Sequence, residues 1–135
     1  MYIFNYRKLN AYQHAKDLTC EVYSLIKEFP IEERYALSDQ LRRAAISIPS
    51  NIAEGASRSS QKEQIHFIEI AFGSLNELMC QLEIAHDLGY IADEQLNSID
   101  AKVRIVAQLL SGLKKSKEEK IRVKGEKSPP LSIQH

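Results

Sequence analysis

Apolar residues recur at steps of three and four positions in four successive segments of this sequence, and this spacing constrains the fold more than any other feature. Such steps place the side chains on one face of an α-helix. No stretch shows the sustained alternation between turn signals that is typical of a strand. The longest series runs without a miss through Ile65, Ile68, Phe72, Leu75, Met79, Leu82 and His86. The pattern predicts an all-α protein.

Three of the predicted helices have clear limits. The first lies between Arg7 and Phe29 and stops at Pro30. The third opens on a capping-box pattern, Ser60 followed by Glu63, and stops at Gly89. The fourth starts near Asp93. Its apolar series is Leu96, Ile99, Val103, Val106, Leu110 and Leu113.

The second helix, predicted over about residues 36–55, contains a proline. The series Leu41, Ala45, Ile48 and Ile52 continues in phase past Pro49. A helix that broke and restarted there would have no reason to keep its phase. The sequence therefore predicts one helix, kinked where Pro49 removes a backbone hydrogen bond and closed by Gly55.

Short connections between these helices predict an antiparallel, up-down-up-down four-helix bundle about 30 Å long. It is expected to span residues 1–113. Residues 114–135 have few large apolar side chains and a double proline, which favour an extended or disordered tail.

The formal net charge of the chain is zero, but its distribution is uneven. Residues 114–127 carry seven Lys and Arg against three Glu, so this basic tail has a charge of +4 and residues 1–113 have −4. An overall basic field, which would favour nucleic-acid binding by itself, is therefore missing.

The helices carry more apolar residues than the core of one bundle needs. Single exposed apolar residues are common, but a second stripe on all four helices favours self-association. The candidate interface residues are Tyr12, Tyr23, Ile46, Phe67, Ile70, Ile105 and Leu109, with Ile26 and Ala53 beside them.

Basic residues form the candidate nucleic-acid site. Arg42 and Arg43 are expected to point away from the core, and Arg58 and Lys62 extend the group towards the third helix. Free amides at the start of that helix are suited to a phosphate. The alternative is that Arg43 pairs with Asp39 and has no other role.

No combination of residues predicts an enzyme, a cofactor or a metal centre. Glu-x-x-His occurs at Glu63/His66 and at Glu83/His86, but 20 residues separate the two pairs on one helix, about 30 Å. Ser59 and Lys62 have the spacing of some serine–lysine acyl enzymes without the accompanying motifs. Nothing assembles a nucleophile, a base and an oxyanion donor.

The remaining features concern the cysteines and the location. Cys20 and Cys80 form no C-x-x-C motif and fall in apolar helices, so they are expected to be buried free thiols. The start MYIFNYRKLN lacks the apolar region of a signal peptide, and no apolar run approaches the length of a membrane span. A cytoplasmic protein is expected.

Residues 37–91, LSDQLRRAAISIPSNIAEGASRSSQKEQIHFIEIAFGSLNELMCQLEIAHDLGYI, resemble a known family. The segments QLRRAAISIPSNIAEG and FIEIAFGSLNEL are similar to those of the four-helix-bundle proteins encoded in intervening sequences of bacterial 23S ribosomal RNA genes. The likeness extends over about residues 4–113 and leaves the tail outside.

The resemblance implies a small helical protein that forms a homopentameric ring. The family is also similar to the accessory protein of diversity-generating retroelements, which binds nucleic acid and a reverse transcriptase. Those relatives are strongly basic, and the acidic body of this chain departs from that. RNA, DNA and a reverse-transcriptase-like protein are the partners that the resemblance suggests. We therefore expect a homo-oligomeric scaffold that contacts RNA, the alternative being a scaffold that binds only proteins.

Overall fold

The computed structural model describes residues 4–127, and every regular element in this range is helical. The elements are η1 (Asn5–Lys8), α1 (Asn10–Ile26), η2 (Ile31–Glu33), α2 (Leu37–Ala56), α3 (Gln61–Asp87) and α4 (Asp93–Lys127), where η marks a short 3-10 helix. The all-α prediction is confirmed for these residues.

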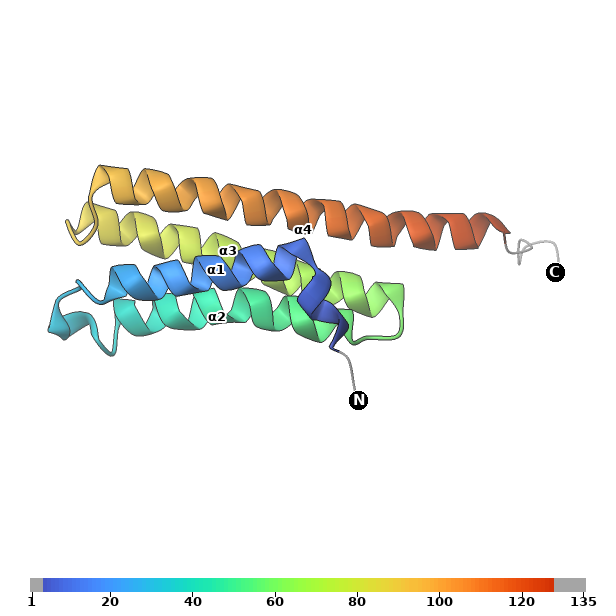
Figure 1. Ribbon diagram of the computed structural model, residues 1–135, viewed down its shortest axis with the longest axis horizontal. Coiled ribbons are helices and arrows are strands. Elements are labelled where there is room, and N and C mark those ends of the chain that lie inside the picture. Colours follow the sequence, from blue (N-terminus) through green and yellow to red (C-terminus); the bar gives the residue numbers. More distant parts are fainter. Residues whose placement is uncertain (1–3, 128–135) are drawn as a thin grey trace, which may run out of the picture.

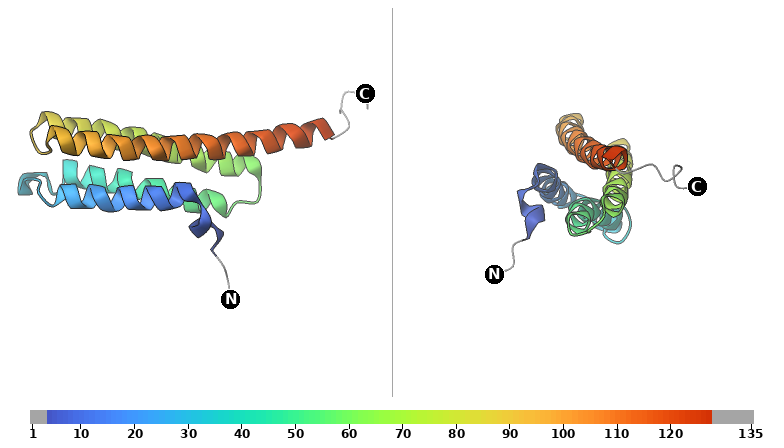
Figure 2. Two further views of the ribbon diagram at one scale, coloured as in Figure 1. Left: turned by 45° about the horizontal axis from the view of Figure 1, so that its top comes forward. Right: turned by 90° about the vertical axis from the view of Figure 1, so that its right-hand side faces the viewer.

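The four long helices lie side by side, and their connections alternate between the two ends of the molecule (Figure 1). α2 packs between α1 and α3, and α4 contacts both α3 and α1. The view along the long axis shows the helices grouped around a common centre (Figure 2). We call the end at η2 and the α3–α4 turn the closed end, and the end at the α2–α3 loop, where α4 extends past its neighbours, the open end.

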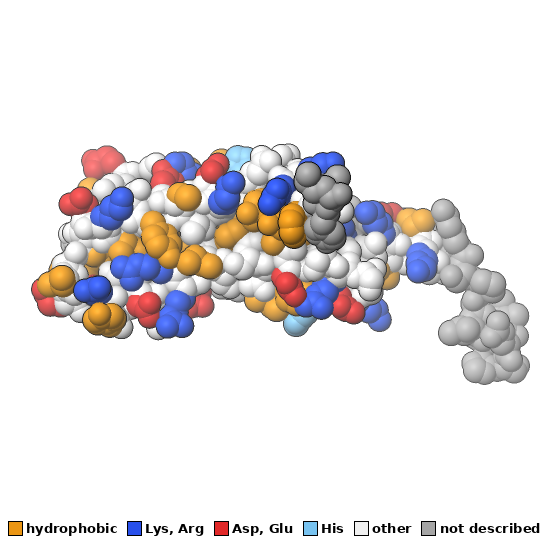
Figure 3. All heavy atoms as spheres, turned by 60° about the horizontal axis from the view of Figure 1, so that its bottom comes forward, with side chains coloured by type: hydrophobic (Ala, Val, Ile, Leu, Met, Phe, Trp, Pro, Cys, Tyr) orange, Lys and Arg blue, Asp and Glu red, His pale blue; other side chains and the backbone are white. Residues whose placement is uncertain are grey.

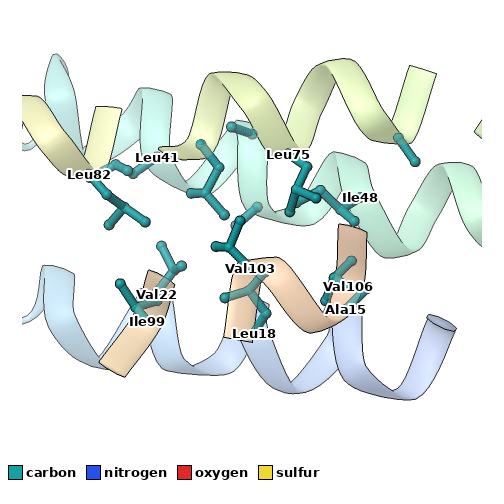
Figure 4. Packing of buried hydrophobic residues seen from close by; sticks show 14 of the residues in the cluster. Ala15, Leu18, Val22, Leu41, Ile48, Leu75, Leu82, Ile99, Val103 and Val106 are labelled. Atoms are coloured by element: carbon teal, nitrogen blue, oxygen red, sulfur yellow. The ribbon is translucent and has the colours of Figure 1, made fainter. Parts of the chain in front are cut away.

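Side chains from all four helices meet in the core (Figure 4). The small residues Ala15, Ala45, Ala71 and Ala85 are fully buried, because the helices approach one another closely there. On α3 the buried face is therefore turned relative to the predicted series. The largest side chains with almost no exposure are Leu18, Val22, Leu41, Ile48, Leu75, Leu78, Leu82, Ile99, Val106 and Leu110.

The ends of α3 form as the sequence predicts. The Ser60 hydroxyl accepts a hydrogen bond from the backbone amide of Glu63 at 3.1 Å. At the other end Gly89 has a φ of 83°, and the amide of Tyr90 donates to the carbonyl of Ala85 at 2.9 Å. This is a Schellman motif, and glycine adopts its left-handed position without steric cost.

α2 is one continuous helix that contains Pro49, as predicted, while its kink stays a prediction. The role assigned to Gly55 was wrong, because α2 continues to Ala56 and Gly55 is buried within it. A Cβ atom at Gly55 would lie 2.9 Å from Cβ of Phe67 on α3. Glycine is needed there for close helix packing rather than for ending the helix.

The conformation predicted for the start of the tail was also wrong, since α4 continues through residues 114–127. Lys, Glu and Arg are good helix formers, and the Arg122 guanidinium donates to the Glu119 carboxylate one turn away. The +4 charge of this segment, the α4 extension, therefore lies along a helix (Figure 2). Residues 128–135 of the predicted tail lie outside the described range.

Three further side chains differ from expectation. Cys20 and Cys80 are exposed, because each lies two residues from the buried positions of its helix, a rotation of about 200°. Ile26, expected on the outer stripe, is 6% exposed and belongs to the core one turn after Val22. Within residues 4–127 no helix is long and apolar enough to cross a membrane.

Candidate nucleic-acid interface

Three lysines meet at the open end of the bundle. Lys62 on α3 and Lys120 and Lys124 on the α4 extension line one hollow of about 730 Å³. Its other lining residues are Ser59, Ser60, Gln61, Ile121 and Gly125, so no Asp or Glu lines it among the residues whose side chains the structure describes. We call this hollow the lysine cleft.

Local structure explains why these residues lie together. The α2–α3 loop is short, and the Ser60 cap fixes the point where α3 begins. Lys120 and Lys124 are four residues apart on α4 and therefore share a face. The first amides of α3 lie beside the cleft, and the amide end of a helix carries partial positive charge. The cleft is thus suited to an anion.

Lys117 lies one turn before Ile121, where the apolar core reaches the open end. It lines a smaller hollow of about 160 Å³ with Leu113, Ile52 and Ile68. Burial lowers the pKa of Lys117, and the neighbouring Lys120 lowers it further. The aliphatic part of the Lys117 side chain therefore packs against the end of the core and is not fully exposed to solvent.

Arg58 borders the α2–α3 loop but already has partners. Its guanidinium pairs with the Glu54 carboxylate and lies 4.8 Å from the centroid of the Phe67 ring. Gln64 donates to the Arg58 carbonyl at 2.7 Å, so both the backbone and the side chain of Arg58 are held. The Arg58 Nε is buried without a hydrogen-bond partner among the described residues. These contacts make Arg58 a fixed edge of the loop.

The other two nominated arginines lie far from this loop. Sixteen residues separate Arg42 from Arg58, about 24 Å along a helix. Arg43 is exposed and pairs with Asp39 at 3.0 Å, as the alternative interpretation predicts. Arg42 is half-buried and lines a hollow between α1 and α2. The structure therefore brings Lys62 together with Lys120 and Lys124, and not with Arg42 and Arg43.

The seven candidate interface residues fall into two groups. Tyr23, Ile46, Ile70 and Ile105 are 36–45% exposed in the single chain. Tyr12 and Leu109 pack partly on their own core, and Phe67 is half-buried beneath Arg58. Large exposed apolar side chains that the sequence did not nominate are Phe4, Ile31, Tyr35, Ile84 and Leu88.

The exposed candidates lie on different sides of the bundle. Ile70 is one turn before Ser74, whose hydroxyl bonds that of Ser47 on α2 at 2.7 Å, so Ile70 lies on the α2 side of α3. Ile105 is one turn after Lys102, which pairs with Glu21 on α1, so Ile105 lies on the α1 side of α4.

Ile46 is one turn after Arg42, on the α1 side of α2. The space-filling view shows hydrophobic side chains among Lys and Arg on the face of α1 and α2 (Figure 3).

The Glu-x-x-His pairs stay separate on α3. His86 bonds Asp93 at the α3–α4 turn, and this hydrogen bond raises the pKa of the imidazole despite partial desolvation. Among the described residues, no three His, Cys, Asp or Glu side chains lie close enough to hold a metal ion.

Residues 7–112 match the model of a protein family described as 23S rRNA-intervening sequence protein. This chain belongs to that family. A crystal structure of a protein of unknown function from the S23 ribosomal protein family of Bacteroides thetaiotaomicron has 26% sequence identity and a TM-score of 0.71. The match covers 78% of this chain and 98% of that one. No functionally curated protein matches the sequence.

The residues that match the family model begin at residue 7 and end at residue 112, within α4. The α4 extension, with Lys120 and Lys124, lies beyond it. Lys120 and Lys124 were not among the residues nominated from the sequence, because the composition of residues 114–135 favoured an extended or disordered tail. One signal was available, since Leu113, Lys117 and Ile121 continue the spacing of the fourth apolar series.

Proposed function

We propose that this intervening-sequence protein is a non-enzymatic, homo-oligomeric scaffold that contacts RNA through the lysine cleft. The observation that carries the proposal is that Lys62, Lys120 and Lys124 line one hollow, and that its described lining residues include no Asp or Glu. Phosphate contacts from lysines and helix amides supply most of the affinity of sequence-independent binding. DNA and a reverse-transcriptase-like protein are the other partners suggested by the family resemblance.

In this proposal the four nominated residues have different roles. Lys62 contacts phosphate directly. Arg58 holds the α2–α3 loop in place, and its ion pair with Glu54 offsets its charge. Arg42 and Arg43 contact only an RNA that runs along α2 from the open end. The absence of aromatic side chains from the lining of the cleft favours recognition of the backbone rather than of bases.

The assembly that we propose is a closed ring of five chains in the cytoplasm, each an up-down-up-down bundle with α2 kinked at Pro49. A ring uses two different patches on every copy. Ile70 on the α2–α3 side and Ile105 on the α4–α1 side supply two such patches. Burying an exposed isoleucine contributes about 1.5–3 kcal/mol, so several together offset the cost of association.

The RNA contact is tested by the binding of structured RNA to the full chain across a salt series. The triple variant Lys62→Ala, Lys120→Ala, Lys124→Ala should lose at least tenfold in affinity and reduce the salt slope by about two to three. The control Lys16→Ala, Lys102→Ala, Arg104→Ala removes the same charge from α1 and α4 away from the cleft. Equal losses in the two variants, or affinity that salt leaves unchanged, would contradict the proposal.

The assembly is tested separately by light scattering at micromolar concentration. Five copies of the 15.4 kDa chain are expected, and a single copy would contradict the ring. A ring that binds no RNA at any salt concentration would favour the alternative, a scaffold that binds only proteins. The observation in favour of that alternative is the exposure of further large apolar side chains outside the nominated interface, Ile31, Tyr35, Ile84 and Leu88.

A further inference from the structure

A second cationic hollow lies at the closed end, between α1, η2 and the start of α2. It has a volume of about 330 Å³. Three cationic side chains line it, Lys27, Arg34 and Arg42, and no Asp or Glu is among the lining residues. The rest of the lining is Tyr23, Ile26, Phe29, Pro30, Ile31 and Ser38. We call it the α1–α2 hollow.

The three cations have no carboxylate partner among the residues that the structure describes. Arg42 donates only to the carbonyl of Arg34, at a long 3.5 Å, and the Arg34 guanidinium lies 5.2 Å from the centroid of the Tyr35 ring. Of the carboxylates near the hollow, Asp39 pairs with Arg43 and Glu33 accepts from Tyr90. Three like charges around one hollow are unfavourable unless an anion joins them.

Ser38 adds a hydroxyl to the lining of the hollow. The residue is only 2% exposed. Ser38 and Arg42 are four residues apart and therefore share the face of α2 that lines the hollow. A serine hydroxyl at this place is able to donate one hydrogen bond to a ligand in the hollow.

The start of α2 adds further donors. Gln40 is the first residue whose amide bonds a preceding carbonyl of the helix, that of Ala36. Ala36 occupies the N-cap position and offers no side-chain acceptor, so the amides before Gln40 lack a cap. An anion is stabilised at such a helix end.

We infer that the α1–α2 hollow binds a phosphate monoester. Arg34 and Arg42 would bind two oxygens each, Lys27 would neutralise the remaining charge, and Ser38 would donate to one oxygen. A doubly charged, tetrahedral group uses this many donors, whereas a carboxylate offers only two oxygens for them. Tyr23 and Phe29 form an apolar wall for the group that carries the phosphate. The site is distinct from the lysine cleft, from which α2 separates it by about 24 Å.

One ligand chemistry has two sources here, a small phosphate ester or the 5′-phosphate of a nucleic acid. Binding of inorganic phosphate to the full chain, followed by NMR, tests the site itself. Arg42→Ala should weaken saturable binding at least tenfold, and Ser38→Ala about threefold or more. Arg43→Ala, the neighbouring exposed and paired arginine, is the matched control and should change the affinity less than twofold.

Two results would overturn the inference: no saturable binding by the wild-type chain up to tens of millimolar phosphate, or equal weakening by Arg42→Ala and Arg43→Ala.

The second experiment compares the binding of short RNAs with a 5′-phosphate and with a 5′-hydroxyl, and this experiment alone rests on the proposed function. A preference for the phosphate that Arg42→Ala removes assigns the site to nucleic-acid ends. Phosphate binding without that preference assigns it to a small ester. Loss of RNA binding in the lysine-cleft variant leaves the phosphate result intact, so the two proposals fail separately.

Discussion

The two halves of α4 are held in the helical state by different forces. Residues 93–113 place Ile99, Val106 and Leu110 in the core, where their side chains are at most 2% exposed. The α4 extension, residues 114–127, passes the end of α1 and α2 and has half-buried Ile121 and Val123 as its main apolar side chains (Figure 1). The first half is a part of the bundle that tertiary packing fixes. The second depends on helix propensity and pairs of charges.

The largest expected effect comes from the bundle side of this comparison. Leu78→Ala removes a fully buried side chain of α3 and should lower the free energy of unfolding by about 2–5 kcal/mol. Val123→Ala, in the extension, should lower it by less than about 1 kcal/mol. Urea denaturation of the two variants measures both values. Similar losses would show that the extension is as firmly packed as the core.

Gly55 tests how closely the bundle helices approach. Gly55→Ala would bring the new Cβ to 2.9 Å from Cβ of Phe67, and overpacking of this kind costs about 1–3 kcal/mol. The gain in helix propensity, at most about 1 kcal/mol, offsets part of this cost. A net destabilisation of about 1–2 kcal/mol is expected in urea denaturation.

Gly112→Ala and Gly125→Ala are the matched controls, one in each half of α4. A Cβ at either position meets no atom within 4 Å, so each substitution should stabilise its helix by up to about 1 kcal/mol. A stabilised Gly55→Ala variant would mean that α2 and α3 separate at little cost.

These residues show what the sequence could and could not predict. Apolar residues at steps of three and four were enough to find four helices, and Ser60, Glu63 and Gly89 were enough to find the ends of α3. Both kinds of signal are local in the sequence. The buried face of α3 was missed in part, because Ala71, Ala85 and Ser74 are buried by close helix approach rather than by their own hydrophobicity. Gly55 was interpreted as a helix end because its close contact with Phe67 on α3 is a tertiary feature that the local sequence does not reveal.

The candidate sites depended on longer-range information. Lys62 and Lys120 are 58 residues apart in the sequence, and only the packing of α4 beside α3 brings them to one hollow. Arg42 and Arg43 were nominated together as neighbours. Their side chains differ by about 100° around α2, so one lines the α1–α2 hollow and the other pairs with Asp39 in solvent.

Removal of the extension separates folding from binding. A chain that ends at Leu113 keeps every fully buried side chain of the core, so its free energy of unfolding should fall by less than about 1 kcal/mol. The same chain lacks Lys120 and Lys124 and should lose at least tenfold in RNA affinity at low salt. Urea denaturation and a salt series of RNA binding measure the two effects. An unfolded truncated chain would show that Lys117 and Ile121 close the core in a way the bundle needs.

The smallest effect concerns pH and again distinguishes the halves of α4. The hydrogen bond from Arg122 lowers the pKa of Glu119 below its ordinary value of 4.5, against an opposing effect of desolvation. A lowered pKa in the folded state means that the pair stabilises the helix above that value, and that this contribution is lost as the pH falls through the lowered pKa. Because both side chains are more than half exposed, the effect on global unfolding should be too small to detect.

NMR should instead show the effect locally. Amide chemical shifts of residues 114–124 should move towards random-coil values below pH 4.5, while those of residues 99–110 stay fixed. Glu119→Gln should remove most of this response. A response that persists in that variant would mean that charges other than this pair hold the extension helical.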